Sequence, residues 1–130
     1  MTMLFSIGLG GALGAMSRYL IGGWVGGWTV GLFGGAMPLG NVAVNVLGSF
    51  LLGALIQFSA LTWSPSEEMR AFLVIGLLGG FTTFSAFSME VVLLFERGRL
   101  DMALLYVLGS VVLAVAGLFA GMKLVRAVLA

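Results

Sequence analysis

Hydrophobic residues fill four long stretches of this chain, and short polar or glycine-rich segments separate them. A helix that spans a membrane needs about 20 predominantly apolar residues, so each stretch predicts one transmembrane helix. The four predicted helices cover approximately residues 4–23, 39–61, 69–95 and 102–128. The segment Trp24–Pro38 is rich in glycine and tryptophan, and we expect it to link the first two helices. Little sequence remains outside the spans, so residues 1–130 are expected to form a single transmembrane domain.

Two short polar segments indicate where helices begin and end. The segment Ser64-Pro65-Ser66-Glu67-Glu68 has the composition of a helix N-terminus, with a capping serine and acids in the first turn. The segment Glu96–Asp101 is short and charged. It predicts a polar hairpin between the third and fourth helices.

Composition supports the membrane assignment and narrows the chemistry. The chain of 130 residues is 61% hydrophobic and 8% charged, whereas soluble domains carry about 25% charged residues. It contains no cysteine and no histidine, which excludes disulfides, thiolate metal sites and the usual histidine proton relay. A net charge of +1 does not provide the basic surface that is typical of nucleic-acid-binding proteins. We therefore expect an all-α integral membrane protein.

The positive charges hardly favour one orientation in the membrane. With four spans, both termini and the loop between the second and third helices lie on one side. That side carries Arg70, Lys123 and Arg126, and the other carries Arg97 and Arg99. Because excess lysine and arginine mark the cytoplasmic side, so small a bias predicts that the chain inserts both ways. Two opposite copies would then pair about an axis in the membrane plane, as inverted repeats do in larger transporters.

The third apolar stretch contains a dense run of small and polar residues between Gly79 and Glu90. Hydrocarbon offers no hydrogen-bond partner, so polar groups and broken backbone occur at membrane depth only where they face protein or water. This run is therefore the main functional-site hypothesis. The pairs Gly79-Gly80 and Thr82-Thr83 are expected to break the helix and free backbone carbonyls. Such oxygens suit a hard monovalent cation, as in transporters with discontinuous helices.

The same run carries paired aromatic and hydroxyl side chains. Phe84 and Phe87 are three residues apart and share a helix face, and Ser85 and Ser88 form a second such pair. Paired phenylalanines in a membrane helix usually belong to a packed core. Aromatic ring edges are electropositive, however. If the edges of two phenylalanine rings pointed into a narrow passage, they would attract an anion. They would bind it less tightly than a full positive charge, so the anion could leave.

A polar stripe runs along the second helix, where Asn41, Asn45 and Ser49 recur every four residues. Hydrogen bonding between helices is one explanation. The other is that the Asn45 amide donates to an ion that has lost its water. The residues alone do not choose between the two.

The remaining polar positions lie on the first and fourth helices. Arg18 in the first helix is either a structural strut or a source of positive potential in a vestibule that gathers anions. The fourth helix adds Tyr106 and Ser110, one turn apart. Glu90, at the end of the polar run, has no partner that the sequence identifies.

Over nearly its whole length the chain resembles the Fluc (CrcB) family of bacterial fluoride channels. The resemblance rests on Gly-Asn-Val-Ala-Val-Asn-Val-Leu-Gly at residues 40–48, Gly-Gly-Phe-Thr-Thr-Phe-Ser-Ala-Phe-Ser at residues 79–88, and the Glu-Arg-Gly that follows at 96–98. It implies a channel, not an enzyme, in the bacterial cytoplasmic membrane. Passive fluoride efflux through it would protect the cell from fluoride. It also implies an antiparallel homodimer of dual-topology subunits with two pores.

The resemblance further implies roles for single residues. Asn45 matches the pore asparagine of the family, and Phe84 and Phe87 match its phenylalanine box. The implied polar track comprises Thr83, Ser85, Ser88, Tyr106 and Ser110. Arg18 matches a family arginine in the first helix.

A sodium ion at the dimer centre is also implied, held by the backbone carbonyls of Gly79 and Thr82 from both subunits. Asn41 departs from the family, in which threonine is expected at this position. An amide still offers donors, so the departure affects local geometry rather than function.

The alternative function is a proton-coupled small exporter of the dual-topology multidrug type, which has a similar length and helix count. Such a transporter needs a titratable carboxylate in its binding chamber, and that family places one in the first helix. The first predicted helix here contains no acid, and Glu90 is the only carboxylate within a predicted span. The residues therefore favour the channel.

Overall fold

A computed structural model describes residues 1–130, and it contains helices and no strands. The elements in chain order are α1 (Thr2–Phe33), α2 (Leu39–Leu61), α3 (Glu67–Arg70), the π-helix η1 (Ala71–Leu78), α4 (Gly79–Phe81), α5 (Ser85–Glu96) and α6 (Leu100–Leu129). Four helical segments are long and apolar enough to cross a membrane: α1, α2, the segment from Glu67 to Glu96, and α6. This confirms the all-α architecture with four spans and an interrupted third span.

The first helix ends ten residues later than the sequence predicts, because the segment expected to be a link continues α1 as far as Phe33. Glycine normally weakens a helix, but here it permits close packing. A Cβ atom at Gly40 of α2 would collide with the backbone of Gly22. The helix ends where Gly34 adopts a left-handed conformation, with φ 70°, and its N–H donates to Val30.

The predicted cap of the third span is confirmed, since the Met69 N–H donates to the Ser66 hydroxyl at 3.2 Å. The sequence did not reveal the wide π-helical winding that follows. π-Helices are rare in proteins, and many of those that occur lie at functional sites. The hairpin between α5 and α6 is also present, and Gly98 occupies the left-handed region there, with φ 72°.

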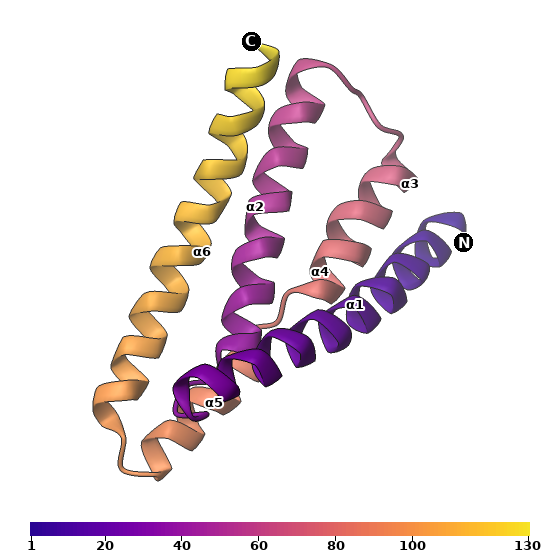
Figure 1. The fold of residues 1–130 in the computed structure, drawn as a ribbon. Helices are drawn as coiled ribbons and strands as arrows, with labels where there is room; N and C mark the ends of the chain where they lie inside the picture. The colour runs from indigo at the N-terminus through magenta and orange to yellow at the C-terminus, as the bar shows by residue number, and fades with distance from the viewer.

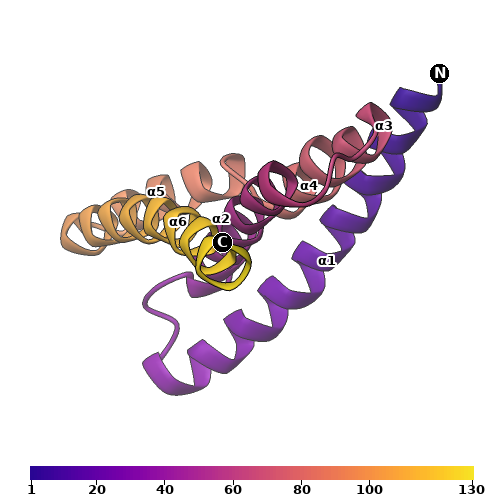
Figure 2. The ribbon, with the colours of Figure 1, turned by 90° about the horizontal axis from the view of Figure 1, so that it is seen from above.

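The helices form two pairs that diverge (Figures 1 and 2). In one pair, α6 runs alongside α2, and in the other, α1 lies against η1 and α4. Beyond the interruption, α5 turns away and packs against the first turns of α6. A small buried cluster of Leu94, Ala103 and Tyr106 lies at this junction.

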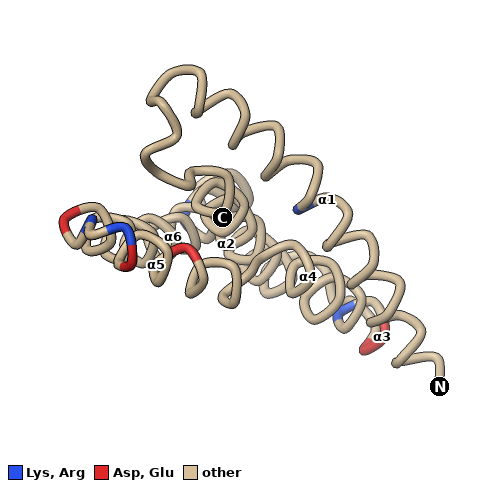
Figure 3. The backbone as a smooth tube through the Cα atoms, turned by 90° about the horizontal axis from the view of Figure 1, so that it is seen from below, with Lys and Arg blue, Asp and Glu red and all other residues tan.

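Charged residues gather in the α5–α6 hairpin and around α3, leaving most of the helical surface apolar (Figure 3). The exceptions are Arg18 on α1, Glu90 on α5, and Lys123 and Arg126 near the end of α6. Such a distribution keeps charge out of the hydrocarbon, where it would be costly. The exposed residues are mainly large and apolar, as expected for surfaces that face lipid or another subunit.

The contact between α2 and α6 depends on glycine at the crossing points. A Cβ atom at Gly53 would collide with the carbonyl oxygen of Leu118, and one at Gly121 would collide with that of Phe50. Small residues permit this close approach of backbones in membrane helices.

Gly53→Ala is expected to lower the free energy of unfolding by about 1–3 kcal/mol, the usual cost of an overpacked interior. Reversible unfolding in mixed detergent micelles measures it. Gly27→Ala is the matched control, because no atom lies within 4 Å of its added methyl group. Equal stability of the two variants would contradict this account of the α2–α6 contact.

Candidate functional site

The third span is interrupted at Thr82–Phe84, between α4 and α5. The predicted break is confirmed, but Gly79 and Gly80 remain helical and the backbone leaves the helix at Thr82, where ψ is 159°. Gly80 instead allows α4 to pack closely against α1, because a Cβ atom at this position would collide with the backbone of Gly11. Polar contacts across the chain stabilise the interruption itself.

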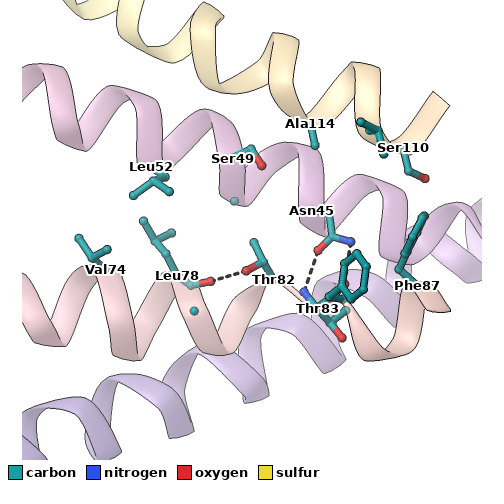
Figure 4. Close-up of a pocket in the computed structure, with 14 residues that line it drawn as sticks. Asn45, Ser49, Leu52, Val74, Leu78, Thr82, Thr83, Phe87, Ser110 and Ala114 are labelled. Atoms are coloured by element: carbon teal, nitrogen blue, oxygen red, sulfur yellow. Dashed lines mark hydrogen bonds between the residues drawn. The ribbon is translucent and has the colours of Figure 1, made fainter. Parts of the chain in front are cut away.

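Asn45 of α2 binds the peptide group of Thr83 at both ends of its amide (Figure 4). The Thr83 N–H donates to Asn45 Oδ1 at 2.8 Å, and Asn45 Nδ2 donates to the Thr83 carbonyl at 3.0 Å. An asparagine amide has two N–H donors, so one N–H remains. The side chain therefore joins α2 to the interruption and keeps a single donor for anything else.

Thr83 caps α5 with its hydroxyl, because the Ala86 N–H donates to Thr83 Oγ1 at 3.2 Å. The same oxygen lies 3.4 Å from the Ser85 hydroxyl. Hydroxyl caps of this kind satisfy the free N–H groups at a helix start. Thr83, itself buried, is thus held by its backbone and its side chain.

The interruption leaves several carbonyls at the end of α4 without a helical partner, and those of Gly79 and Thr82 are among them. In a continuous helix the Gly79 carbonyl would accept from the Thr83 N–H, and the Thr82 carbonyl would accept from the Ala86 N–H. Both N–H groups bind side-chain oxygens instead, and no other hydrogen bond to either carbonyl is present. Gly79 is exposed and Thr82 is half-buried, so the free oxygens lie near the surface of the subunit.

A pocket of about 340 Å³ lies between α2, the interruption and α6 (Figure 4). No charged residue lines it. Its polar side chains are those of Asn45, Ser49, Thr82, Thr83 and Ser110. The Ser110 hydroxyl is buried and has no hydrogen-bond partner in the chain. Because buried polar groups are nearly always paired, this hydroxyl is available to a hydrogen-bonding group that enters the pocket.

Phe84 and Phe87 line the same pocket and form one aromatic series with Tyr106. The ring centroids of Phe84 and Phe87 are 5.5 Å apart, as are those of Phe87 and Tyr106. Phe84 is 79% exposed. It therefore contributes little to packing within one subunit and is not part of a single-chain core.

A second, wider pocket of about 980 Å³ lies between α1, α2 and α5. It is lined in part by Arg18, Asn41, Thr83, Ser85 and Glu90. Arg18 makes no hydrogen bond or ion pair within the chain, so it is not an internal strut. Thr83 lines both pockets and lies where they approach each other.

Glu90 binds two side chains that the sequence did not connect with it. Asn41 Nδ2 donates to Glu90 Oε1 at 2.6 Å, and the Tyr106 hydroxyl donates to Glu90 Oε2. The cluster joins α2, α5 and α6. The four-residue spacing of the polar stripe placed Asn41 on an interior face, but only the fold brings the partners together.

Tyr106→Phe is expected to lower the free energy of unfolding by about 1–3 kcal/mol, because one oxygen of a half-buried carboxyl group loses its donor. The ring and its contact with Phe87 are kept. Unfolding in mixed micelles measures the change, and Tyr19→Phe, at an 81% exposed position, is the control. A Tyr106→Phe protein as stable as that control would show that the hydrogen bond to Glu90 contributes nothing.

The structure groups most, but not all, of the sequence-predicted residues. One pocket brings together Asn45, Gly79, Thr82, Thr83, Phe84, Phe87 and Ser110, and the other contains Arg18 and Ser85. Ser88 and Tyr106 line neither pocket. Ser88 donates to the Phe84 carbonyl, and Tyr106 to Glu90. Ser49 lines the first pocket and was absent from the implied polar track, although its place in the α2 stripe indicated that face.

Comparisons with known proteins agree over the length of the chain. Residues 5–122 match the family described as CrcB-like protein, Camphor Resistance (CrcB). A protein from Rhodospirillum centenum is 48% identical over 130 residues, which is 100% of both chains. Another from Agrobacterium fabrum is 49% identical over 120 residues, covering 92% of this chain and 93% of the relative. A third, from Rhodopseudomonas palustris, is 48% identical over 120 residues. Each of the three is named a fluoride-specific ion channel.

Proposed function

Because the chain belongs to the CrcB-like protein family, we propose that it conducts fluoride passively out of the bacterial cell. It is a multi-pass protein of the cytoplasmic membrane and not an enzyme. Fluoride-specific relatives that match the whole length of the chain support the choice of ion. Efflux of this kind would protect the cell from fluoride toxicity.

The single observation that carries the proposal is the uncharged polar pocket beside the interruption of the third span. Fluoride is small and strongly hydrated, so a selective pore must replace much of its water without binding it too tightly. The pocket offers the free N–H of Asn45, the unpaired hydroxyl of Ser110 and two phenylalanine rings. These are neutral donors. We propose that Asn45, Thr83, Phe84, Phe87, Ser85, Ser88, Tyr106 and Ser110 line the path, and we add Ser49.

Arg18 is proposed to act in the wider pocket as a source of positive potential. Its guanidinium has no partner within the chain and shares that pocket with hydroxyl groups and with Glu90, whose carboxyl oxygens accept from Asn41 and Tyr106. A cation in a recessed, low-dielectric cavity concentrates anions there. The driving force is the membrane potential, because an inside-negative potential favours the exit of an anion by about 2.3 kcal/mol per 100 mV.

We propose that the active assembly is an antiparallel homodimer with two pores. The balanced charges on the two sides support insertion in both orientations. A second subunit would also cover Phe84, which one chain leaves 79% exposed, and would close the open pockets. Fluoride passing through a closed pathway would then meet both phenylalanines.

A structural sodium ion at the dimer centre is proposed as well, held by the Gly79 and Thr82 carbonyls of both subunits. The residues fit this ion, because both carbonyls lack a partner within the chain. No cluster of acidic or other metal-binding side chains is present, and neutral carbonyls suit a hard monovalent cation. When bound, the ion would fix the two interrupted helices relative to each other.

Purified protein in liposomes loaded with fluoride or with chloride tests the function. We expect rapid fluoride efflux once the membrane potential is released, little chloride efflux, and no dependence on a proton gradient. Liposomes that retain fluoride as well as empty ones do would refute the channel. Strict dependence on a proton gradient would instead support a coupled transporter, the class to which the multidrug-type alternative belongs.

A further inference from the structure

Asn45 and Thr83 accept two of the N–H groups that a continuous helix would pair with carbonyls across the interruption. The Asn45 amide oxygen takes the Thr83 N–H at 2.8 Å, and the Thr83 hydroxyl takes the Ala86 N–H at 3.2 Å. Their ordinary helical acceptors would be the carbonyls of Gly79 and Thr82.

We infer that Asn45 and Thr83 are positioning residues for the cation site, because their side chains accept the N–H groups that would otherwise occupy the Gly79 and Thr82 carbonyls. This rests on the proposed sodium site. Asn45 is assigned a second role in addition to its proposed contact with fluoride. Its amide lines the same uncharged pocket as Gly79 and Thr82 and binds the Thr83 peptide group (Figure 4).

The local geometry explains why the released oxygens do not find other partners. The Thr82 hydroxyl donates back to the Leu78 carbonyl at 2.9 Å and is unavailable to either oxygen. The pocket beside Thr82 contains no charged group. An unpaired carbonyl near hydrocarbon is costly, so a cation that binds both oxygens stabilises the interruption.

Thermal unfolding of the purified full-length protein tests the inference, with sodium chloride as the only probe and choline chloride keeping the ionic strength constant. Sodium that binds only the folded protein raises the unfolding temperature in a saturable way. Asn45→Leu and Thr83→Val are expected to need about 10- to 100-fold more sodium for half the effect, as when groups that orient metal ligands are removed. Thr83→Ser keeps the capping hydroxyl and is expected to respond like the wild type.

Two matched controls remove similar contacts elsewhere. Gln57→Leu deletes a buried amide of α2 that accepts from Arg126, and Thr29→Val deletes a buried hydroxyl that donates to the Val25 carbonyl. Both are expected to keep the wild-type sodium midpoint even where they lower the unfolding temperature. If Asn45→Leu does not fold, the pair Thr83→Val and Thr83→Ser decides alone.

A wild-type sodium midpoint in Thr83→Val or in folded Asn45→Leu would overturn the inference. So would a wild-type protein whose unfolding temperature does not respond to sodium, because there would then be no cation site to position. Neither outcome affects fluoride efflux by the wild-type protein in liposomes. The failure of this inference is therefore distinguishable from the failure of the channel proposal.

Discussion

Asn45→Leu is expected to reduce fluoride efflux about a hundredfold, which corresponds to about 2.7 kcal/mol in the barrier to permeation. The substitution removes the remaining amide N–H of Asn45, a residue that lines the uncharged pocket. It also removes both hydrogen bonds to the Thr83 peptide group, so the interruption loses its link to α2. Efflux from proteoliposomes, normalised to the amount of folded protein, measures the effect.

Gln57→Leu is the control for Asn45→Leu, because it also replaces a side-chain amide of α2 with leucine, and Gln57 lines neither pocket. We expect its efflux to remain within about threefold of wild type, a difference of less than 1 kcal/mol. Wild-type efflux through folded Asn45→Leu would remove this residue from the conduction path.

Phe84→Ile is expected to reduce fluoride efflux at least about tenfold, or about 1.4 kcal/mol, and to leave the fold intact. Isoleucine preserves hydrophobic bulk but has no electropositive ring edge to present to an anion. The fold should tolerate the change because the side chain is 79% exposed in the single chain. Efflux and unfolding temperature, measured on the same preparation, separate the two effects.

Phe119→Ile provides the comparison for Phe84→Ile, since Phe119 is also an exposed phenylalanine of a membrane span, at 60%. It lies outside the four described pockets. We expect wild-type efflux from it. Equal efflux from both variants would mean that the ring of Phe84 has no part in selecting or passing the ion.

Some properties of this protein can be predicted from its sequence alone. Four apolar stretches of membrane-spanning length determine the number of helices, because each helix satisfies its own backbone within the bilayer. The polar run from Gly79 to Glu90 indicates the interruption and its neighbourhood. The helix cap at Ser66 is equally local, since it depends only on residues three apart.

Other properties were decided by the tertiary structure alone. The close contact of Gly22 on α1 with Gly40 on α2 joins distant segments, and α1 continues beyond it through the glycine-rich segment as far as Phe33. The two partners of Glu90, Asn41 and Tyr106, come from two other helices, α2 and α6.

The replacement of the helical bond to the Gly79 carbonyl also depends on the tertiary structure, because Asn45 lies 38 residues before Thr83 in the chain. The Thr83 cap that replaces the bond to the Thr82 carbonyl is local, since it joins residues three apart. Sequence patterns report hydrogen bonds that a helix makes within itself, at separations of three or four residues. They do not report which side chain of another helix replaces one of those bonds. Helix packing determines that replacement, and in this protein helix packing brings the residues of the site together.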